Sequence, residues 1–199
     1  FYAEYFVNLG FEVLIFDKRG CGDSSGNYAT SRYADLAADA IACLETMKNR
    51  ETVDKKKIGL WGFSQGAMLL PYVVSKTSIP SFIIAKSPEI ESVIEASAFA
   101  DSLRVKTLGF SAEEARIVAE NHRKTGELIR SGADYRKVEQ FIRQNARKHG
   151  VMNRTGLSGN TSITKSAFDG YYWRDRIFDF RSYWRDLKIP ALVLFGSDD

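Results

Sequence analysis

The sequence predicts an α/β fold with a mostly parallel sheet and a long helical insertion. Three short apolar runs lie at 11–16, 58–61 and 81–85, and each gap between them contains a segment with helical periodicity. Strands that alternate with helices in this way are typical of a parallel sheet. A fourth run, at 191–195, follows only after a long segment whose apolar spacing is again helical. A compact domain does not hold a structureless loop of that length, so we expect this segment to be a helical insertion.

The other elements follow from local patterns. Residues 1–9 have apolar side chains at helical spacing, and Gly10 suits the end of that helix. The nearly continuous apolar run at 11–16 suits a strand covered on both faces. Within the insertion, Ser111 and Glu114 have the spacing of a capping box, and Asp134 can cap a further helix. The remaining periodic segments predict helices over 31–49, 65–76, 111–130 and 134–148.

Composition limits the classes of function. The net charge of +3 is too small to favour nucleic acid, and no apolar run reaches the roughly 18 residues of a membrane span. Cys21 and Cys43 make no disulfide framework and have no partners at metal-ligand spacing, so we expect no zinc site. Residues 104–188 are richer in basic than in acidic side chains, which is typical of solvated helices and would also suit anionic substrates.

The motif Gly-x-Ser-x-Gly at residues 62–66 is centred on Ser64. It follows a predicted strand and opens a predicted helix, as the nucleophile of a serine hydrolase does. We expect a strained backbone at Ser64, with Gly62 and Gly66 removing side chains that would collide. The backbone N–H of Gln65 is then placed to donate to the oxyanion of acyl transfer. The alternative is a glycine-flanked turn with an idle serine.

A serine nucleophile needs a base and an orienting acid. Asp198 and Asp199 close the last strand and are candidates for the acid; the alternative is that both are turn residues. Both histidines, His122 and His149, precede these acids and lie on predicted insertion helices, where structural roles are expected. We therefore expect the catalytic histidine beyond Asp199.

The glycine-rich loop at 17–26 contains Gly-x-Gly-x-x-x-Gly, which is one residue longer than the dinucleotide fingerprint. No helix begins inside it to receive a pyrophosphate. We interpret it as a tight loop at the sheet edge, positioned by Asp17 and Arg19.

Three segments together resemble α/β-hydrolases. Residues 11–26, with Asp-x-Arg-Gly-x-Gly-x-Ser-x-Gly, resemble the loop after the fourth strand of that family. Residues 57–71 resemble the elbow of its esterase and serine-peptidase branch, including a proline seven residues after the serine, although Phe63 replaces the usual histidine and Ala67 a common glycine. Residues 189–199 resemble the acid-bearing strand, where the spacing Gly-x-x-Asp favours Asp199 over Asp198.

The resemblance implies an α/β-hydrolase fold with a doubly wound sheet and a helical cap. It divides the chain into a first part of the core at 1–88, a cap insertion at 89–188 and an acid-bearing strand at 189–199. Candidate substrate-binding residues are Phe63 beside the nucleophile and the cap aromatics Tyr171, Tyr172 and Trp173, which could instead be cap core. The chain begins inside a helix-like segment and stops just after a strand, so we expect a fragment that lacks the first oxyanion donor and the histidine.

The expected function is cleavage of carboxylic esters through an acyl-enzyme on Ser64. A serine aminopeptidase or dipeptidyl-peptidase-like enzyme would use the same residues, and a non-catalytic hydrolase-like binding module is a further alternative. The expected partner is a small-molecule ester, amide or peptide, with no nucleic acid and no membrane span. This mechanism needs no metal or organic cofactor, so we expect none.

Overall fold

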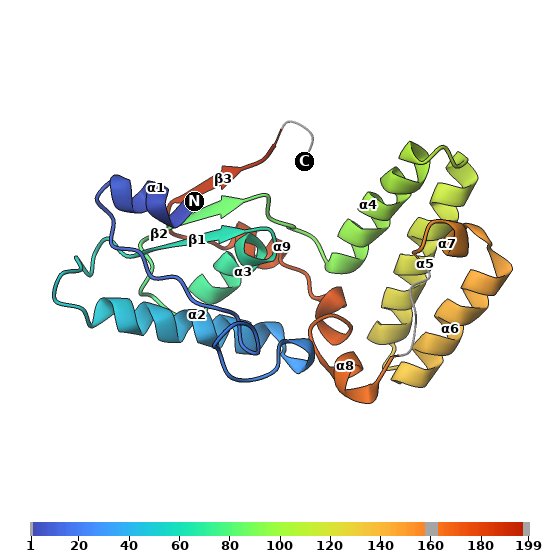
Figure 1. The fold of residues 1–199 in the computed structure, drawn as a ribbon, viewed down its shortest axis with the longest axis horizontal. Helices are drawn as coiled ribbons and strands as arrows, with labels where there is room; N and C mark the ends of the chain where they lie inside the picture. The colour runs from blue at the N-terminus through green and yellow to red at the C-terminus, as the bar shows by residue number, and fades with distance from the viewer. Residues whose placement is uncertain (1, 158–162, 197–199) are drawn as a thin grey trace. The chain divides into compact units, whose positions relative to one another are not determined.

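The computed structural model describes residues 2–157 and 163–196, and the chain divides into two compact units. The first unit, Phe1–Ile90 with Phe180–Asp199, contains the sheet (Figure 1). The second unit, Glu91–Asp179, is helical throughout its described elements. Each unit has buried hydrophobic clusters of its own.

The sheet consists of parallel strands in the order β1 (Gly59–Phe63), β2 (Phe82–Lys86) and β3 (Ala191–Leu194). The predicted α/β class with a parallel sheet is therefore confirmed, whereas a doubly wound sheet stays a prediction. Parallel neighbours require a crossover connection. Helix α3 (Gln65–Val74) connects β1 to β2, and the whole helical unit lies in the connection from β2 to β3. An insertion at this point leaves the strand pairing intact.

Helix α3 packs against the sheet, and the two together form the buried core of the first unit. Ala67 and Leu70 of α3 contact Ile83 and Ala85 of β2, and all four side chains are buried. The side chain of Trp184, on the short helix α9 (Arg181–Arg185), packs against the same cluster. Helix α2 (Tyr33–Lys48) packs against α3 in turn. Its buried residues, Tyr33, Leu36, Ala37 and Leu44, lie on one face, in agreement with the predicted periodicity.

The first residues of the chain form a helix but not the strand predicted after it. Helix α1 (Tyr2–Asn8) ends before Gly10, which has a φ of 88°. The strand predicted at 11–16 is wrong, since this segment is an irregular loop and Ile15 is 78% exposed. A strand is defined by ladder hydrogen bonds to a neighbour, and within the described residues none joins this segment to β1. A short 3-10 turn, η1 (Tyr28–Thr30), precedes α2.

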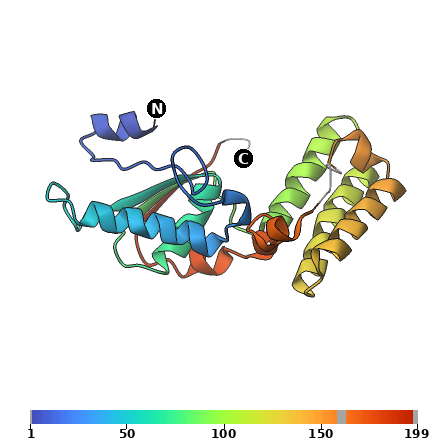
Figure 2. The ribbon, with the colours of Figure 1, turned by 60° about the horizontal axis from the view of Figure 1, so that its bottom comes forward.

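In the helical unit, three long helices pack side by side (Figure 2). Among the described residues, no helix is long and apolar enough to cross a membrane. The long helices are α4 (Val93–Thr107), α5 (Ala112–Arg130) and α6 (Tyr135–Lys148), followed by α7 (Val151–Arg154), α8 (Lys165–Asp169) and η2 (Arg174–Ile177).

Local caps set where these helices begin. Ser111 Oγ accepts a hydrogen bond from the Glu114 N–H, and the Glu114 carboxylate accepts from the Ser111 N–H, which forms the predicted capping box of α5. The Asp134 carboxylate accepts from the Lys137 N–H, as predicted for α6. These bonds satisfy N–H groups that have no partner within their helix. The helix starts are thus encoded within a few residues of sequence.

Glu114 supplies a pH-dependent part of the stability of this unit. Hydrogen bonds from the Ser111 backbone and hydroxyl, together with Arg154, hold the pKa of its carboxyl below the ordinary value of 4.5. A carboxyl with a lowered pKa in the folded state stabilises the fold above its unfolded pKa, and this contribution is lost as the pH falls through the folded value. Glu114→Gln should therefore lower the urea midpoint at about pH 7 and have a smaller effect at about pH 3.

The matched control is Glu127→Gln on the exposed side of α5, because the Glu127 side chain makes no hydrogen bond or ion pair with another described residue. Far-ultraviolet circular dichroism at both pH values measures the midpoints. A loss for Glu114→Gln that is equal at both pH values would contradict the role given to its ionised form.

Candidate active site

Ser64 is the single residue between the end of β1 and the start of α3. Its backbone has φ 51° and ψ −119°, and its side chain is exposed. A residue other than glycine in such a conformation costs about 1–3 kcal/mol, and it persists only where the surrounding structure holds it. This is the strand-to-helix turn that the motif at 62–66 predicts.

Backbone hydrogen bonds fix this turn on both sides. The Ser64 N–H donates to the carbonyl oxygen of Lys86 at 2.9 Å, which extends the pairing of β1 with β2 by one residue. The Ser64 carbonyl oxygen accepts from the Met68 N–H at 2.9 Å and so begins the ladder of α3. The main chain of Ser64 is therefore bonded to two elements, and its hydroxyl projects from a fixed point.

The two glycines that flank Ser64 are not equivalent. A Cβ on Gly62 would lie 2.5 Å from the carbonyl carbon of Gly66, so no side chain fits there without moving backbone. A Cβ on Gly66 would meet nothing within 4 Å outside its own helix turn. The collision expected at Gly62 is confirmed, and the one expected at Gly66 is wrong, because Gly66 lies on an open side of α3.

The backbone N–H of Gln65 is the first of α3. The earliest N–H groups of a helix have no partner within it, and here the ladder begins only at Met68. Among the described residues, the Gln65 N–H makes no hydrogen bond. It is thus a free donor adjacent to Ser64, at the positive end of the helix dipole.

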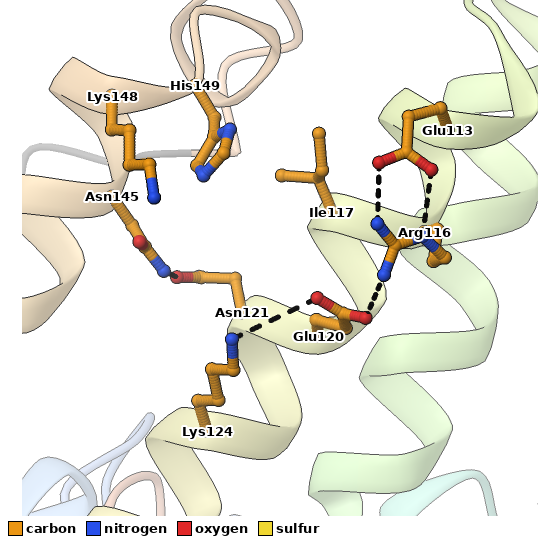
Figure 3. Close-up of a pocket in the computed structure, with 9 residues that line it drawn as sticks. All are labelled: Glu113, Arg116, Ile117, Glu120, Asn121, Lys124, Asn145, Lys148 and His149. Carbon is orange, nitrogen blue, oxygen red and sulfur yellow. Dashed lines mark hydrogen bonds and ion pairs between the residues drawn. The ribbon is translucent and has the colours of Figure 1, made fainter.

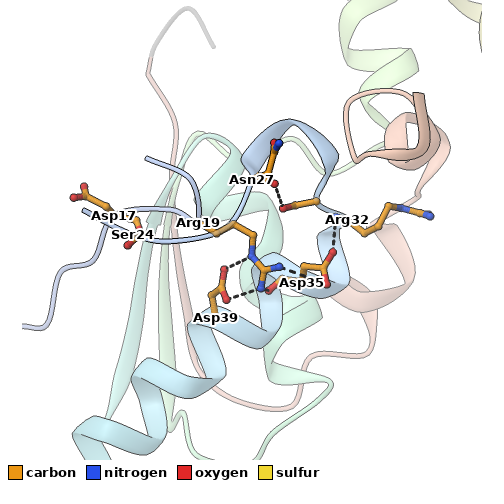
Figure 4. A network of polar contacts seen from close by, with 8 residues as sticks. Asp17, Arg19, Ser24, Asn27, Arg32, Asp35 and Asp39 are labelled. Atoms are coloured by element: carbon orange, nitrogen blue, oxygen red, sulfur yellow. Dashed lines mark hydrogen bonds and ion pairs between the residues drawn. The ribbon is translucent and has the colours of Figure 1, made fainter. Parts of the chain in front are cut away.

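Arg19 anchors the glycine-rich loop to α2 (Figure 4). Its guanidinium donates to both oxygens of the Asp39 carboxylate, at 2.7 and 2.6 Å, and to the carbonyl oxygen of Asp35 at 3.1 Å. The bidentate hydrogen bond to Asp39 holds the pKa of Arg19 above its ordinary value. Within the loop, Ser24 Oγ donates to the carbonyl oxygen of Asp17 at 2.8 Å. The loop is therefore held by its own hydrogen bonds and tied to α2 through Arg19, although most of its residues are exposed.

The same loop and the turn η1 that follows it reach the residue after Ser64. Lys18 Nζ donates to Gln65 Oε1 at 2.8 Å, and Tyr28 Oη donates to the same oxygen at 2.6 Å. Neither Lys18 nor Tyr28 was predicted as a site residue. The Asp-x-Arg pattern was visible in the sequence, but nothing in it indicates contact with a glutamine 47 residues later.

The model of the alpha/beta hydrolase fold family matches residues 3–199, which is nearly the whole chain. The chain belongs to the alpha/beta hydrolase fold family. The order strand, serine with a positive φ and helix is the local pattern described for a nucleophile elbow in this family.

Two relatives from Escherichia coli are similar to parts of this hydrolase-fold chain. Both are described as an uncharacterized 31.7 kDa protein in the traX-finO intergenic region. One is 30% identical over 100 residues, covering 50% of this chain and 32% of the relative. The other is 35% identical over 65 residues, covering 33% of this chain and 23% of the relative. The matches span about a third or less of these relatives, and their names state no activity.

One predicted substrate-binding position lies at the end of a strand. Phe63, the last residue of β1, is 50% exposed, and Lys86 Nζ lies 4.8 Å from the centre of its ring. Asp198 and Asp199 lie outside the described residues, so the predicted acid stays a prediction.

The predicted cap aromatics belong to the helical unit, around the turn between α8 and η2. Trp173 stacks on Phe168 with ring centroids 6.3 Å apart and packs against the buried cluster of α5 and α6. Tyr172 is 52% exposed, and Arg176 lies over its ring at 5.2 Å. Trp173 is thus half-buried against the core of this unit, Tyr171 is half-buried, and Tyr172 is exposed.

Both histidines also belong to the helical unit. His122 Nε2 lies 2.8 Å from the Asp101 carboxylate, and His122 Nδ1 lies 3.4 Å from Arg176, so both ring nitrogens have structural partners. His149 ends α6, where its N–H donates to the carbonyl oxygen of Asn145. The core unit that contains Ser64 has no histidine of its own.

A hollow between α5 and α6 is a separate feature (Figure 3). His149 lines it, but its charged side chains largely pair with one another, as Arg116 does with Glu113 and Glu120. Among residues 2–157 and 163–196, no cluster of acidic, histidine and cysteine side chains could hold a metal ion. Burial raises the pKa of the Cys43 thiol, which disfavours its reactive thiolate form. The elbow at Ser64 is therefore the candidate active site.

The unequal glycines give a direct test of the elbow geometry. Gly62→Ala forces a Cβ into the backbone of Gly66 and should lower the free energy of unfolding by about 1–3 kcal/mol. Gly66→Ala is the matched control, because alanine is favoured over glycine in a helix by up to about 1 kcal/mol and has room here. Urea denaturation of the two variants measures the difference. Equal destabilisation by both would contradict the described turn.

Proposed function

We propose that Ser64 is the nucleophile of a serine hydrolase that cleaves carboxylic esters through an acyl-enzyme. The observation that carries the proposal is the backbone of Ser64, which has a positive φ directly between a parallel strand and a helix. For a serine with no catalytic role, that conformation costs energy without benefit. For a nucleophile, it exposes the hydroxyl beside the amino end of a helix. Membership of the alpha/beta hydrolase fold family supports the same function.

The chemistry follows from the groups around the turn. Ser64 Oγ attacks the ester carbonyl carbon and gives its proton to a general base, while the carbonyl oxygen becomes an oxyanion. The oxyanion accepts a hydrogen bond from the Gln65 N–H, which is already oriented and needs no reorganisation. The intermediate then expels the alcohol, which takes a proton, and leaves an acyl group on Ser64. Water attacks this acyl-enzyme, releases the acid and restores the serine.

The other roles are proposed from the sequence. Asp199 is the acid that orients the catalytic histidine, and that histidine follows Asp199 in the full-length protein. The parallel sheet is part of the doubly wound sheet typical of the family, and the helical unit serves as its cap. Phe63, Tyr171, Tyr172 and Trp173 stay proposed substrate contacts from the sequence, and of the three aromatics in the helical unit Tyr172 is the one whose side chain is more than half exposed.

The test compares esters with amides on the full-length protein. Hydrolysis of p-nitrophenyl acetate and butyrate is expected, and Ser64→Ala should lower kcat/KM by about 10⁴-fold or more. Ser78→Ala, on an exposed loop residue, is the matched control and should leave the rate unchanged. Faster cleavage of aminoacyl p-nitroanilides than of these esters would point to a peptidase instead. A wild-type protein inert toward both substrates, or an active Ser64→Ala variant, would contradict the proposal.

A further inference from the structure

Two side chains converge on the residue that follows the nucleophile. The Gln65 side-chain oxygen accepts hydrogen bonds from Lys18 Nζ at 2.8 Å and from Tyr28 Oη at 2.6 Å. An ammonium group donates hydrogen bonds and cannot accept them, so the oxygen of the Gln65 amide, and not its nitrogen, must face the loop. The orientation of the Gln65 side chain is therefore decided by its partners.

The two donors contact one another and are carried by an anchored segment. Lys18 Nζ lies 3.5 Å from Tyr28 Oη and 5.1 Å from the centre of the tyrosine ring. Lys18 precedes Arg19, which is bonded to α2 through Asp39, and Tyr28 opens the turn η1. Among the described residues, Lys18 forms no ion pair. We call Lys18 and Tyr28 the clamp, because both side chains hydrogen-bond to Gln65. The backbone next to Lys18 is held to α2 through Arg19.

We infer that Lys18 and Tyr28 are positioning residues, which hold Gln65 so that its backbone N–H meets the oxyanion formed at Ser64. The inference rests on the proposed function of Ser64. Gln65 is the first residue of α3, and the peptide that carries its N–H is bonded within the helix only through the Ser64 carbonyl, which accepts from the Met68 N–H. Contacts of the Gln65 side chain therefore add a second restraint on that peptide. A donor stabilises an oxyanion most when its direction is set before the charge develops. Fixing the side chain of Gln65 restricts the rotation of its own peptide.

A positioning role and a structural role predict different kinetics. The substrate carbonyl is neutral when it binds and carries charge only in the transition state. Misdirection of the Gln65 N–H should thus lower kcat and leave KM nearly unchanged. A loss of fold stability alone would reduce the amount of active protein without changing kcat per active site.

The test measures hydrolysis of p-nitrophenyl butyrate by the full-length protein, with active sites counted by titration. Tyr28→Phe and Lys18→Met each remove one hydrogen bond to Gln65 and should lower kcat about fivefold, with KM changed less than about twofold. Lys18→Arg retains a donor and should recover most of the rate. The matched controls, Tyr5→Phe on α1 and Lys57→Met on the loop before β1, concern exposed side chains and should equal wild type.

A double variant tests whether Tyr28 affects kcat through Gln65 or by another route. Gln65→Leu keeps the backbone N–H but removes the acceptor, so adding Tyr28→Phe to it should cause no further loss of kcat. An additive loss in the double variant would show that Tyr28 acts by another route and would overturn the inference.

The outcomes distinguish the inference from the function on which it rests. An active wild type that matches Tyr28→Phe and Lys18→Met in kcat, while Ser64→Ala is inactive, overturns the positioning role alone. A wild type without hydrolytic activity overturns the proposed function and the positioning role together.

Discussion

The strained backbone of Ser64 is the constraint on which the rest of this site depends. A positive φ at a serine costs about 1–3 kcal/mol, so the neighbouring elements must hold it. The bond from its N–H to the Lys86 carbonyl connects it to β2, and the bond from Met68 to its own carbonyl connects it to α3. Because α3 packs on the sheet, the hydrogen-bond partners of Ser64 in β2 and α3 are held at fixed positions relative to each other. Gly62 allows the close approach of backbone that this geometry requires.

The glycine-rich loop is the second support of the turn. Arg19 holds this loop to α2 through two hydrogen bonds from its guanidinium to the Asp39 carboxylate. Because α2 packs against α3, the loop and the helix that begins after Ser64 share one framework. Lys18 and Tyr28 use that framework to reach Gln65. Segments that are far apart in sequence therefore determine the geometry of two successive residues, the proposed nucleophile and the proposed oxyanion donor.

Features encoded by near neighbours could be predicted from sequence, and those that depend on distant partners could not. The motif that marks the turn at Ser64 and the capping box of Ser111 each span only a few positions of sequence, and both features were found where predicted. The strand expected at 11–16 failed because apolar composition favours a strand but only a paired neighbour creates one. The contacts of Lys18 and Tyr28 with Gln65 could not be predicted, because no local sequence pattern marks them. Only the folded chain brings these residues together. The predicted acid Asp199 lies outside the described residues and stays a prediction.

The central claim is that Ser64 is a nucleophile, and covalent labelling tests it most directly. The full-length protein is treated with a fluorophosphonate, digested and analysed by mass spectrometry to locate the phosphonyl group. A single adduct on Ser64, absent from Ser64→Ala and retained by Ser78→Ala, is the predicted result. No adduct on the wild type, an adduct at another serine, or equal labelling of Ser64→Ala would contradict it.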